Sequence, residues 1–432
     1  MKSLEFIDLF AGLGGTRIGF EQACEQLNIK ANCVYTSEIK DFAVDIYKHN
    51  FNNEEVHGDI TQIDPKLIPD FDILLGGFPC QAFSNAGKRH GFDDTRGTLF
   101  YDVARIIAEK KPQGFLLENV EGLVTHDRVN REEPIGNTLI TILSVLQDLN
   151  YHVEWKVLNS KEFGVPQERK RIYIVGSKKS KASLNNFTNV YKTFSDIQEK
   201  GLPALKSKFT DRLLERYSPK ELMGKAIKDK RGGKSNIHSW DLELKGPLSS
   251  QQKKLMRELL KQRRKKDWAI SKQITWMDGM PLTIGEIHSF FNSIDKDSLK
   301  EILDDLVHKN YLKFEHPKDL VRDINGRSKR EYATHAEKGY NIVTGKLSFE
   351  LNRILNPSGI APTIVATEAD RLGVIDSDKI RRLSERECLR FFGFPEEYKS
   401  NISHKHLYDL IGNTVVVPVI KQVSLRLLNH IS

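Results

Sequence analysis

One cysteine of the chain stands where a nucleophile could be held. Cys80 directly follows Pro79 at the end of the apolar run FDILLGGF, and the polar, glycine-containing stretch QAFSNAGKRHGFDDTRG comes after it. That stretch is too long for a tight turn between a strand and a helix, so the cysteine stands at the base of a loop. Basic residues in the loop, Arg96 among them, favour the thiolate form of a nearby thiol. A buried structural cysteine is the common alternative, but this setting favours a nucleophile.

Further polar side chains accompany two other apolar runs. Glu118 and Asn119 end the run GFLLENV, where a carboxylate is either a general acid with a raised pKa or a salt-bridged structural residue. In QERKRIYIVG, alternate residues share one face, so Arg169 and Arg171 are expected to point the same way, just after Gln167. Two guanidinium groups there could bind a phosphate or the electron-rich edge of a base; a solvated basic edge is the alternative.

The first predicted strand runs into the glycine-rich turn DLFAGLGG, Asp8 to Gly15. Glycines at such a turn let the backbone approach a ligand closely and leave free amides at the helix start. A complete GxGxxG fingerprint would need glycine at position 17, which is Arg17, so a dinucleotide is disfavoured. Glu38 ends the second strand, where an acid binds a ribose diol, and Asp59 could accept from an adenine amino group. These positions favour a nucleoside cofactor without a pyrophosphate over NAD.

The elements that must position these residues alternate between strands and helices up to about residue 177. Short β-rich runs are separated by segments whose apolar residues recur at three and four positions, as on surface helices. This alternation predicts an α/β fold with a doubly wound, mostly parallel, Rossmann-like sheet, in which function collects at the carboxyl ends of the strands. The predicted strands are 4–10, 33–38, 71–78, 114–120, 152–159 and 171–176, and the predicted helices are 16–27, 41–49, 98–110 and 137–149.

The alternation stops after Gly176, where lysine-rich polar sequence begins. The expected division is a first domain over 1–178, a smaller basic domain over 179–375, and a C-terminal segment, 376–432, that returns to the first domain. Within the second domain, 253–268 predicts a strongly basic helix. The sequence that follows reads as helix, turn, helix and a β-like tail, which predicts a winged helix-turn-helix within 250–320. A solvated helical hairpin is the alternative.

The composition of the chain indicates which kinds of partner it can bind. The chain has 432 residues, a formal net charge of +8 and a pI near 9.0, which favour a polyanionic partner such as nucleic acid. Its four cysteines show no CxxC spacing, which disfavours a zinc site or a disulfide framework and predicts reduced thiols and no bound metal. The N-terminus lacks the long apolar core of a signal peptide, and no run approaches the length of a membrane span, so a cytoplasmic location is expected.

The motifs DLFAGLGG, GGFPCQAFS, ENV, QERKR, RECLRFFGFP and GNTVVV resemble, in the same order, those of the C5-cytosine DNA methyltransferases. The resemblance covers 1–177 and 353–432. It implies that 1–178 is the catalytic, cofactor-binding domain and that the variable target-recognition region of the family spans about 179–375. It implies an S-adenosylmethionine-dependent enzyme that flips a cytosine out of double-stranded DNA and methylates its carbon 5. By analogy with bacterial members, it implies a restriction-modification role with a restriction endonuclease as functional partner. We expect a monomer.

The resemblance assigns roles within the catalytic motifs. Cys80 adds as a thiolate to carbon 6 of the ring, Glu118 donates to N3, and Arg171 holds the carbonyl oxygen. Arg169 steadies the cysteine region, while Asn119 fixes the neighbouring backbone. The loop after the cysteine closes over the flipped base. The predicted catalytic residues are therefore Pro79, Cys80, Glu118, Asn119, Gln167, Arg169 and Arg171.

By the same resemblance, the cofactor lies against the first glycine-rich turn, with Glu38 at its ribose, Asp59 at its adenine and Asn413 near its amino acid end. The residue after Glu38 is Ile39, where relatives often carry a tryptophan over the adenine, so cofactor affinity is expected to differ. The predicted cofactor residues are Phe10, Gly12, Gly14, Glu38, Ile39, Asp59, Ile60, Leu99 and Asn413. The predicted DNA contacts are Ser84, Arg96, Thr363, Arg263, Arg264 and Lys265.

Two other classes share parts of this pattern. Transfer-RNA cytosine methyltransferases share the catalytic core, but they typically have a second proline before the ProCys pair and a smaller recognition region, whereas this chain has Phe78 and a long region over 179–375. DNA is therefore favoured over transfer RNA. A DNA-binding regulator that kept the fold without catalysis would have no need of Cys80, Glu118 and Arg171, all of which are present.

Overall fold

The structure is a computed structural model that describes most of the chain in two compact units. The described residues are 2–79, 99–130, 132–230, 232–233, 235–275, 279–322, 328–344 and 349–431. Three predicted site residues, Cys80, Ser84 and Arg96, lie outside these ranges. The first unit comprises 1–200, 356–370 and 383–432, and the second comprises 201–355 and 371–382. The units therefore divide at other positions than the 178 and 375 expected from the sequence.

The first unit is built on a six-stranded sheet with the order β2-β1-β3-β4-β6-β5. Strands β1 to β4 run parallel, and β6 runs antiparallel to both β4 and β5. The predicted α/β, mostly parallel, doubly wound fold is thereby confirmed. The strands are β1 (Lys2–Leu9), β2 (Ile29–Ser37), β3 (Ile73–Gly76), β4 (Gly114–Val120), β5 (His152–Asn159) and β6 (Lys170–Ser177).

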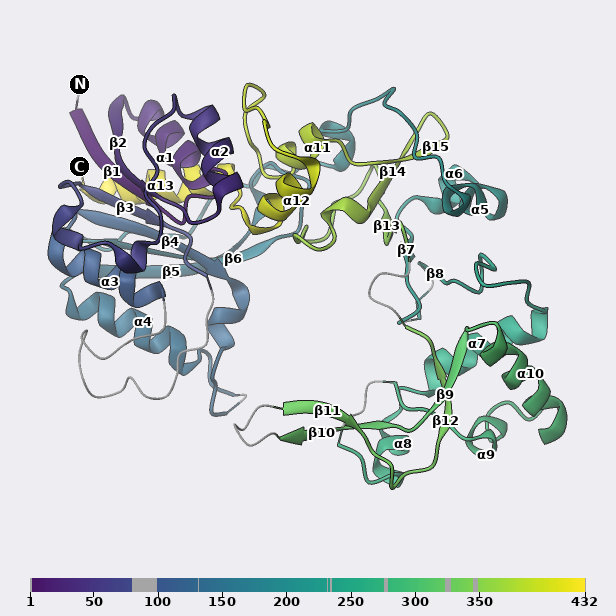
Figure 1. Ribbon diagram of the computed structural model, residues 1–432. Helices are drawn as coiled ribbons and strands as arrows, with labels where there is room; N and C mark the ends of the chain where they lie inside the picture. Colours follow the sequence, from purple (N-terminus) through teal and green to yellow (C-terminus); the bar gives the residue numbers. More distant parts are fainter. Residues whose placement is uncertain are drawn as a thin grey trace. The chain divides into compact units, whose positions relative to one another are not determined.

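Helices cover both faces of this sheet, as Figure 1 shows. The alternation of side chains along β1 explains how: Phe6 contacts Phe20 of α1 on one face, while Ile7 and Leu9 pack with α3 residues such as Val103 on the other. Helices α3 and α4 lie on one face, and α1, α2 and α13 lie on the opposite face. The helices are α1 (Gly15–Gln26), α2 (Asp41–Asn50), α3 (Leu99–Lys110), α4 (Asn137–Asp148) and α13 (Val417–Ile431).

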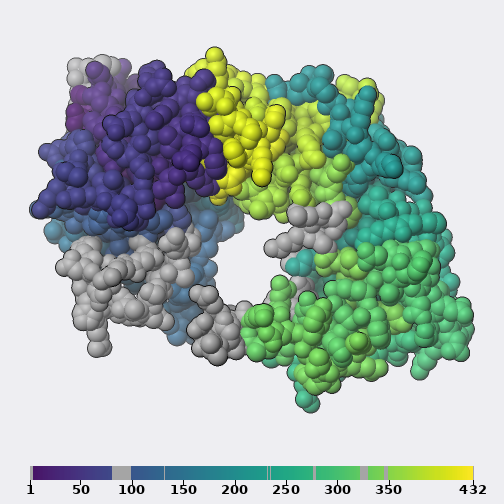
Figure 2. Space-filling view, in the orientation of Figure 1, coloured from purple at the N-terminus to yellow at the C-terminus, as the bar shows by residue number. Residues whose placement is uncertain are grey.

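The end of the chain completes the first unit. Helices α11 (Glu385–Arg390), α12 (His404–Asn413) and α13 follow one another, and in Figure 2 the yellow C-terminal residues pack directly against the purple N-terminal ones. Tyr398, for example, donates from its hydroxyl to the Leu13 carbonyl at 2.8 Å. Among the described residues, His404–Ile431 is the one helical stretch of the length and apolarity of a membrane span, and 67% of its apolar window is buried within the protein.

The second unit contains a five-stranded sheet with the order β15-β14-β13-β7-β8. Its core joins residues from α5, α6 and these strands, including Leu213, Leu222, Ile354 and Ile380. The elements are α5 (Lys208–Arg216), α6 (Pro219–Leu222), β7 (Ala226–Ile227), β8 (Asn236–Ile237), β13 (Arg353–Ile354), β14 (Leu372–Asp376) and β15 (Lys379–Arg382).

A second core of this unit gathers helices around a short sheet, with Trp240, Leu259, Leu303 and Tyr340 buried. The elements are α7 (Ser250–Gln262), α8 (Lys266–Ser271), α9 (Ile284–His288), α10 (Lys296–His308), β9 (Leu312–Glu315), β10 (Lys318–Arg322), β11 (Ser328–Tyr332) and β12 (Gly339–Ile342). The single basic helix predicted over 253–268 is wrong, because α7 ends at Gln262 and α8 begins at Lys266. Between them, the Arg263 carbonyl accepts from the amide of Met280, which fixes the break.

Candidate active site

Most of the predicted catalytic and cofactor residues that the structure describes converge at one edge of the first unit's sheet. The parallel strands β1 to β4 end at this edge and antiparallel β6 begins there, so the following loops surround a cavity of about 430 Å³. That volume suits a small-molecule site. The predicted residues that line it are Phe10, Gly12, Glu38, Ile39, Asp59, Ile60, Pro79, Leu99, Glu118, Asn119, Arg169, Arg171 and Asn413. Gly14, Gln167 and Thr363 are not among the lining residues.

The turn after β1 has the backbone that its glycines predict. Phe10, Gly12 and Gly14 have positive φ angles of 58°, 52° and 73°. A Cβ atom added to Gly14 would lie 2.4 Å from the Phe51 ring, so this glycine serves packing between α1 and α2 rather than the cavity. The turn therefore brings backbone rather than side chains to the cavity wall.

Glu38 holds this turn in place from the end of β2. Its Oε2 accepts from the Gly12 amide at 2.9 Å, and its Oε1 accepts from the amides of Ile39 and Lys40 at 2.8 and 3.0 Å. Ile39 stands at the rim with 68% of its surface exposed. The carboxylate is therefore fixed in position before any ligand arrives, and it retains acceptor capacity on both oxygens.

Other cavity residues are held by local contacts. Asp59 accepts at Oδ1 from the Thr61 amide at 2.9 Å, which starts the short helix containing Ile60. Asn413, at the end of α12, donates from Nδ2 to the Asp409 carbonyl at 2.8 Å. Residues that the sequence reasoning passed over also line the cavity: Thr16, Ser37, Lys40, Leu410, Gly412, Thr414 and Val415. Several belong to the GNTVVV motif or follow β2, which is the signal that could have found them.

Glu118 and Arg171 form an ion pair in the cavity wall. Arg171 Nε lies 3.2 Å from Glu118 Oε1, because β4 and β6 are neighbouring strands and place the two residues diagonally. Burial raises the pKa of Glu118 above its usual value, and the nearby Arg171 and Arg169 oppose that rise. The Arg171 guanidinium also donates from Nη1 to the Lys170 carbonyl at 2.8 Å. A carboxyl group that keeps its proton more readily than usual thus faces the cavity beside a cation.

Arg169 is almost fully buried and connects β6 to segments far along the chain. It donates to the carbonyl oxygens of Ile364, Gly412 and Thr414 at 3.1, 3.1 and 2.9 Å. Its Nε has no hydrogen-bond partner among the described residues. Burial lowers the pKa of Arg169 to about 10, and the neighbouring Arg171 adds to that effect. The residue still carries its charge at neutral pH, and it organises the backbone around the cavity.

Asn119 and Gln167 contact backbone groups rather than the open cavity. Asn119 donates from Nδ2 to the Phe78 carbonyl at 2.9 Å and accepts at Oδ1 from the Val120 amide at 2.8 Å. It therefore holds the backbone just before Pro79. Gln167 is fully buried, donates to the Phe391 carbonyl at 3.1 Å and accepts from the Ile364 amide at 3.0 Å. Gln167 is thus held between two backbone groups and does not line the cavity, so its catalytic role stays a prediction.

The predicted DNA contacts have different surroundings. Thr363 donates from its hydroxyl to the Glu168 carbonyl at 2.7 Å. Arg264 lines a separate cavity of about 730 Å³ in the second unit, and Lys265 is exposed. Arg263 is 3% exposed and donates from Nη1 to Asn341 Oδ1 at 2.5 Å. The DNA contact expected of Arg263 is therefore corrected to a packing role inside the second unit.

A buried polar network behind the glycine-rich turn had no clear signal in the sequence. Tyr47 donates to Asp8 Oδ2 at 3.4 Å, and Arg17 donates to the Tyr47 hydroxyl at 3.3 Å and to Glu54 at 2.5 Å. Burial raises the pKa of Asp8 to about 7, although Arg17 and the Tyr47 hydrogen bond act against the rise. Asp8, Arg17 and Tyr47 lie in β1, α1 and α2, and Glu54 follows α2, so only folding reveals these groups as one cluster.

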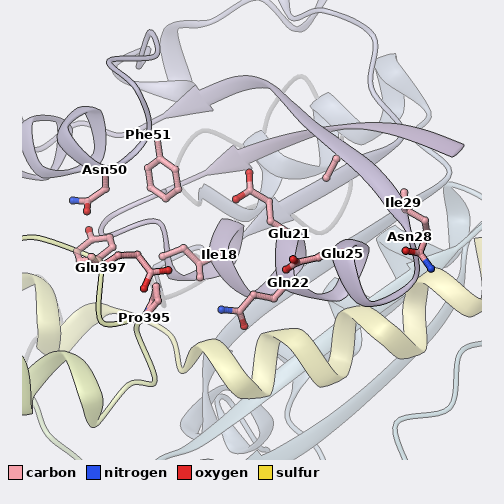
Figure 3. Close-up of a pocket in the computed structure, with 12 residues that line it drawn as sticks. Ile18, Glu21, Gln22, Glu25, Asn28, Ile29, Asn50, Phe51, Pro395 and Glu397 are labelled. Atoms are coloured by element: carbon pink, nitrogen blue, oxygen red, sulfur yellow. The ribbon is translucent and has the colours of Figure 1, made fainter. Parts of the chain in front are cut away.

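A further cavity of the first unit, about 560 Å³, lies along α1. Figure 3 shows Glu21, Gln22 and Glu25 of α1 around it, with Glu397 opposite. It reaches Ile29 at the amino end of β2, whereas function in such sheets collects at the carboxyl ends. Its carboxylates also disfavour nucleic acid. Among the described residues, no group of three or more His, Cys, Asp or Glu could hold a metal ion.

The sheet, its flanking helices and the cavity at the strand ends define an α/β enzyme of the methyltransferase type. Residues 4–429 match the family model of the C-5 cytosine-specific DNA methylases, and the chain belongs to this family. The resemblance seen in the motifs is thereby confirmed, and the protein is a DNA cytosine-5 methyltransferase.

Similar proteins support the assignment along the whole chain. Type II methyltransferase M.NlaIV of Neisseria lactamica and type II methyltransferase M.NgoBV of Neisseria gonorrhoeae are each 54% identical over 429 residues, covering 99% of this chain and 100% of theirs. Among solved structures, the Dnmt2 methyltransferase of S. pombe aligns with a TM-score of 0.52 at 17% identity, covering 99% of this chain and 98% of its own. That structural likeness bears on the fold alone.

Proposed function

We propose that the enzyme transfers a methyl group from S-adenosylmethionine to carbon 5 of a cytosine flipped out of duplex DNA, through a covalent bond between Cys80 and carbon 6. The observation that carries this proposal is a single cavity. It joins the fixed carboxylate of Glu38 and the glycine-rich turn to the buried Glu118–Arg171 pair, next to Pro79. A cofactor and a base could therefore meet in one place.

The residues of the cavity fit the cofactor. Glu38 offers a positioned acceptor for a ribose diol, and Asp59 has its Oδ1 engaged by its own backbone turn and a second oxygen for an adenine amino group. Phe10, Ile39, Ile60 and Leu99 supply apolar walls, and Asn413 lies at the far side with the GNTVVV motif. When bound, S-adenosylmethionine supplies a methyl group made electrophilic by its positively charged sulfur.

The chain's own residues make carbon 5 reactive. The thiolate of Cys80 adds to carbon 6, and the electron pair of the 5,6 double bond becomes available at carbon 5. Glu118 gives a proton to N3, so negative charge does not build up on the ring, and Arg171 donates to the carbonyl oxygen. Methyl transfer leaves S-adenosylhomocysteine. Water then takes the proton from carbon 5, the sulfur of Cys80 departs as the 5,6 double bond re-forms, and the N3 proton returns to Glu118. The raised pKa of Glu118 suits a proton donor.

The substrate must enter as an unstacked base, because carbon 6 is inaccessible inside a duplex; flipping costs a few kcal/mol. The similar proteins from Neisseria are named type II methyltransferases. We therefore infer that this enzyme protects DNA in a restriction-modification system, beside an endonuclease of the same specificity. We also infer that it acts as a monomer in the cytoplasm.

The test is methyl transfer from labelled S-adenosylmethionine to duplex DNA and, in parallel, to transfer RNA. We expect labelling of DNA by the wild type and by Cys33→Ala, and none by Cys80→Ala. Cys33 is a suitable control because it is a free, half-buried cysteine in β2 that does not line the cavity. Labelling of RNA alone would favour the transfer-RNA class, and unchanged labelling by Cys80→Ala would rule out the covalent route.

A second readout tests the covalent bond itself. With 5-fluorocytosine at the target position, the fluorine on carbon 5 prevents the final elimination, so the enzyme should remain attached to the DNA. We expect a stable adduct with the wild type and with Cys33→Ala on denaturing gels. DNA that is methylated normally at cytosine but forms no adduct at 5-fluorocytosine contradicts the proposed role of Cys80.

A further inference from the structure

The second core of the second unit has the element order of a winged helix-turn-helix. Helices α7 and α8 are followed by a short extended segment at Leu282, then by α9, α10, β9, the β10–β11 hairpin and β12. Leu282 and Tyr340 of β12 exchange backbone hydrogen bonds at 3.0 and 2.7 Å, so the extended segment joins the β9–β12 sheet. In helix-turn-helix proteins the second helix of the motif reads the major groove with its N-terminal residues. Helix α10 holds that position here.

The surface of α10 is unsuited to a DNA groove. Its N-terminal turn is capped by Asp295, whose carboxylate accepts from the amides at the helix start. Lysine charge is partly neutralised within the helix, since Lys300 pairs with Asp304 at 2.5 Å. The exposed charged residues of the cap and helix, apart from His308, are Asp295, Lys296, Asp297, Lys300, Glu301 and Asp304. Acidic groups prevail among them, and DNA phosphates would repel this side of the helix.

The β10–β11 hairpin has two faces of different character. In the antiparallel register, Lys318 is opposite Tyr332 and Leu320 is opposite Arg330, so these four side chains share one face. The opposite face carries Asp319, Val321, Lys329 and Glu331. The hairpin extends from the end of β9, away from α9 and α10 (Figure 1).

The acidic face of the hairpin is engaged within the unit. Asp319 accepts from the Thr275 amide at 2.9 Å and from the Thr275 hydroxyl at 2.5 Å. Lys329 pairs with Glu331 on the same strand at 3.2 Å. The contacts of Asp319 with Thr275 hold the hairpin against the segment after α8. They thereby also fix the orientation of the opposite face of the hairpin.

The basic face combines cations with large apolar groups. Leu320 and Tyr332 are 42% and 53% exposed, and Lys318 Nζ lies 4.6 Å from the centre of the Tyr332 ring. The Tyr332 hydroxyl donates to Glu315 at 3.2 Å, and Lys313 pairs with that carboxylate at 2.8 Å. None of the four side chains on this face is acidic. A positive, partly apolar ribbon is complementary to a groove bounded by phosphates.

We propose that the basic face of the β10–β11 hairpin, and not α10, is the element of this motif that contacts duplex DNA. A two-stranded ribbon fits the major groove. Lys318 and Arg330 bind phosphates, and Leu320 and Tyr332 pack against bases and sugars. The inference rests on the proposed function only in taking duplex DNA as the substrate.

The test uses the full chain and a labelled duplex whose methylated site has been located by bisulfite sequencing. Lys318→Ala and Arg330→Ala should each weaken binding about tenfold and reduce the salt slope of the affinity by about 1. Lys329→Ala is the matched control: it removes one positive charge from the same hairpin but on the opposite face, and should change affinity less than about twofold. Leu320→Ser tests the apolar contact without a change of charge and should also weaken binding.

The outcomes separate this inference from the proposed function. A wild-type enzyme that does not methylate duplex DNA contradicts the proposed function itself. If the wild type methylates DNA, equal losses in Lys329→Ala and Arg330→Ala indicate a general charge effect and overturn the inference. Stronger losses in Lys296→Ala/Lys300→Ala than in the hairpin variants would assign the contact to α10. Thermal unfolding of every variant shows whether a loss of DNA binding reflects misfolding. If a charge variant is misfolded, DNA binding by Leu320→Ser decides whether this face contacts DNA.

Discussion

Glu118 is the residue whose chemistry depends most on its surroundings. Burial favours its neutral form, whereas Arg171 at 3.2 Å favours its charged form, and burial is the larger influence on its pKa. A proton donor needs the neutral form, so the pair offers a carboxyl that can hold a proton and a cation that can stabilise the charge left after donation. A protein that only bound DNA would have no need of a buried proton donor beside a cation.

Glu118→Gln should lower kcat by about 10²-fold to 10⁴-fold, because the amide can donate a hydrogen bond but cannot give up a proton. The pKa of Glu118 is raised, so its protonated form persists to higher pH than usual and the wild-type rate should fall as pH rises through that pKa. This limb of the pH–rate profile should be absent in Glu118→Gln. Glu121→Gln is the control, since Glu121 is exposed and follows β4. An unchanged profile in Glu118→Gln would contradict the proposed role.

The glycine-rich turn leads into α1, and the GNTVVV segment leads into α13. Both segments line the cavity, so α1 and α13 must approach closely for the site to form. Gly19 is the contact point: a Cβ atom there would lie 2.6 Å from the Ile420 Cβ and 2.8 Å from the Val417 carbonyl oxygen. Both neighbours are backbone or branched atoms that cannot move aside alone. The position of the cofactor turn therefore depends on the contact between α1 and α13.

Gly19→Ala should destabilise the fold by about 1–3 kcal/mol through overpacking. Gly58→Ala should have an effect within about 0.5 kcal/mol, because nothing lies within 4 Å of the added Cβ atom. Urea unfolding of both variants measures the difference. Equal stability of the two variants would show that α1 and α13 can separate without cost.

At the scale of the whole molecule, the first unit is assembled from three stretches of chain, 1–200, 356–370 and 383–432. Arg169 joins them, since its carbonyl partners belong to Ile364, Gly412 and Thr414. The cavity lies entirely within this unit. Cofactor binding should therefore stabilise the first unit and leave the second unchanged.

S-adenosylhomocysteine at about 100 times its Kd should stabilise the first unit by about 2.7 kcal/mol. Scanning calorimetry of the full chain should show one transition that moves up with ligand and one that stays. The shift should shrink in Glu38→Gln, which weakens the acceptor at the turn. Equal movement of both transitions would mean that the units unfold together, and a full shift in Glu38→Gln would remove Glu38 from the cofactor site.

Much of this architecture was determined by the sequence itself. The six strands and four helices predicted for the first unit are all present. They could be predicted because their apolar residues recur at the spacing that a strand or a helix needs to bury one face. Glu38 and Glu118 could be placed near one another from sequence, since the polar ends of parallel strands meet at one edge of a sheet. The family motifs added the roles, and the family assignment is confirmed.

Only the tertiary structure decided which of the predicted side chains are available to a substrate, because that availability depends on contacts with residues far away in the chain. The sequence places Arg263 in a basic surface. In the structure, α7 ends just before Arg263, and the side chain is buried against Asn341. Gln167 sits in a catalytic motif, yet its partners are backbone groups near residues 364 and 391. The hairpin's basic face exists only because Lys318 and Leu320 pair with a strand whose register no local pattern specifies. Local periodicity predicts elements; burial and pairing across the chain decide which side chains remain available to a substrate.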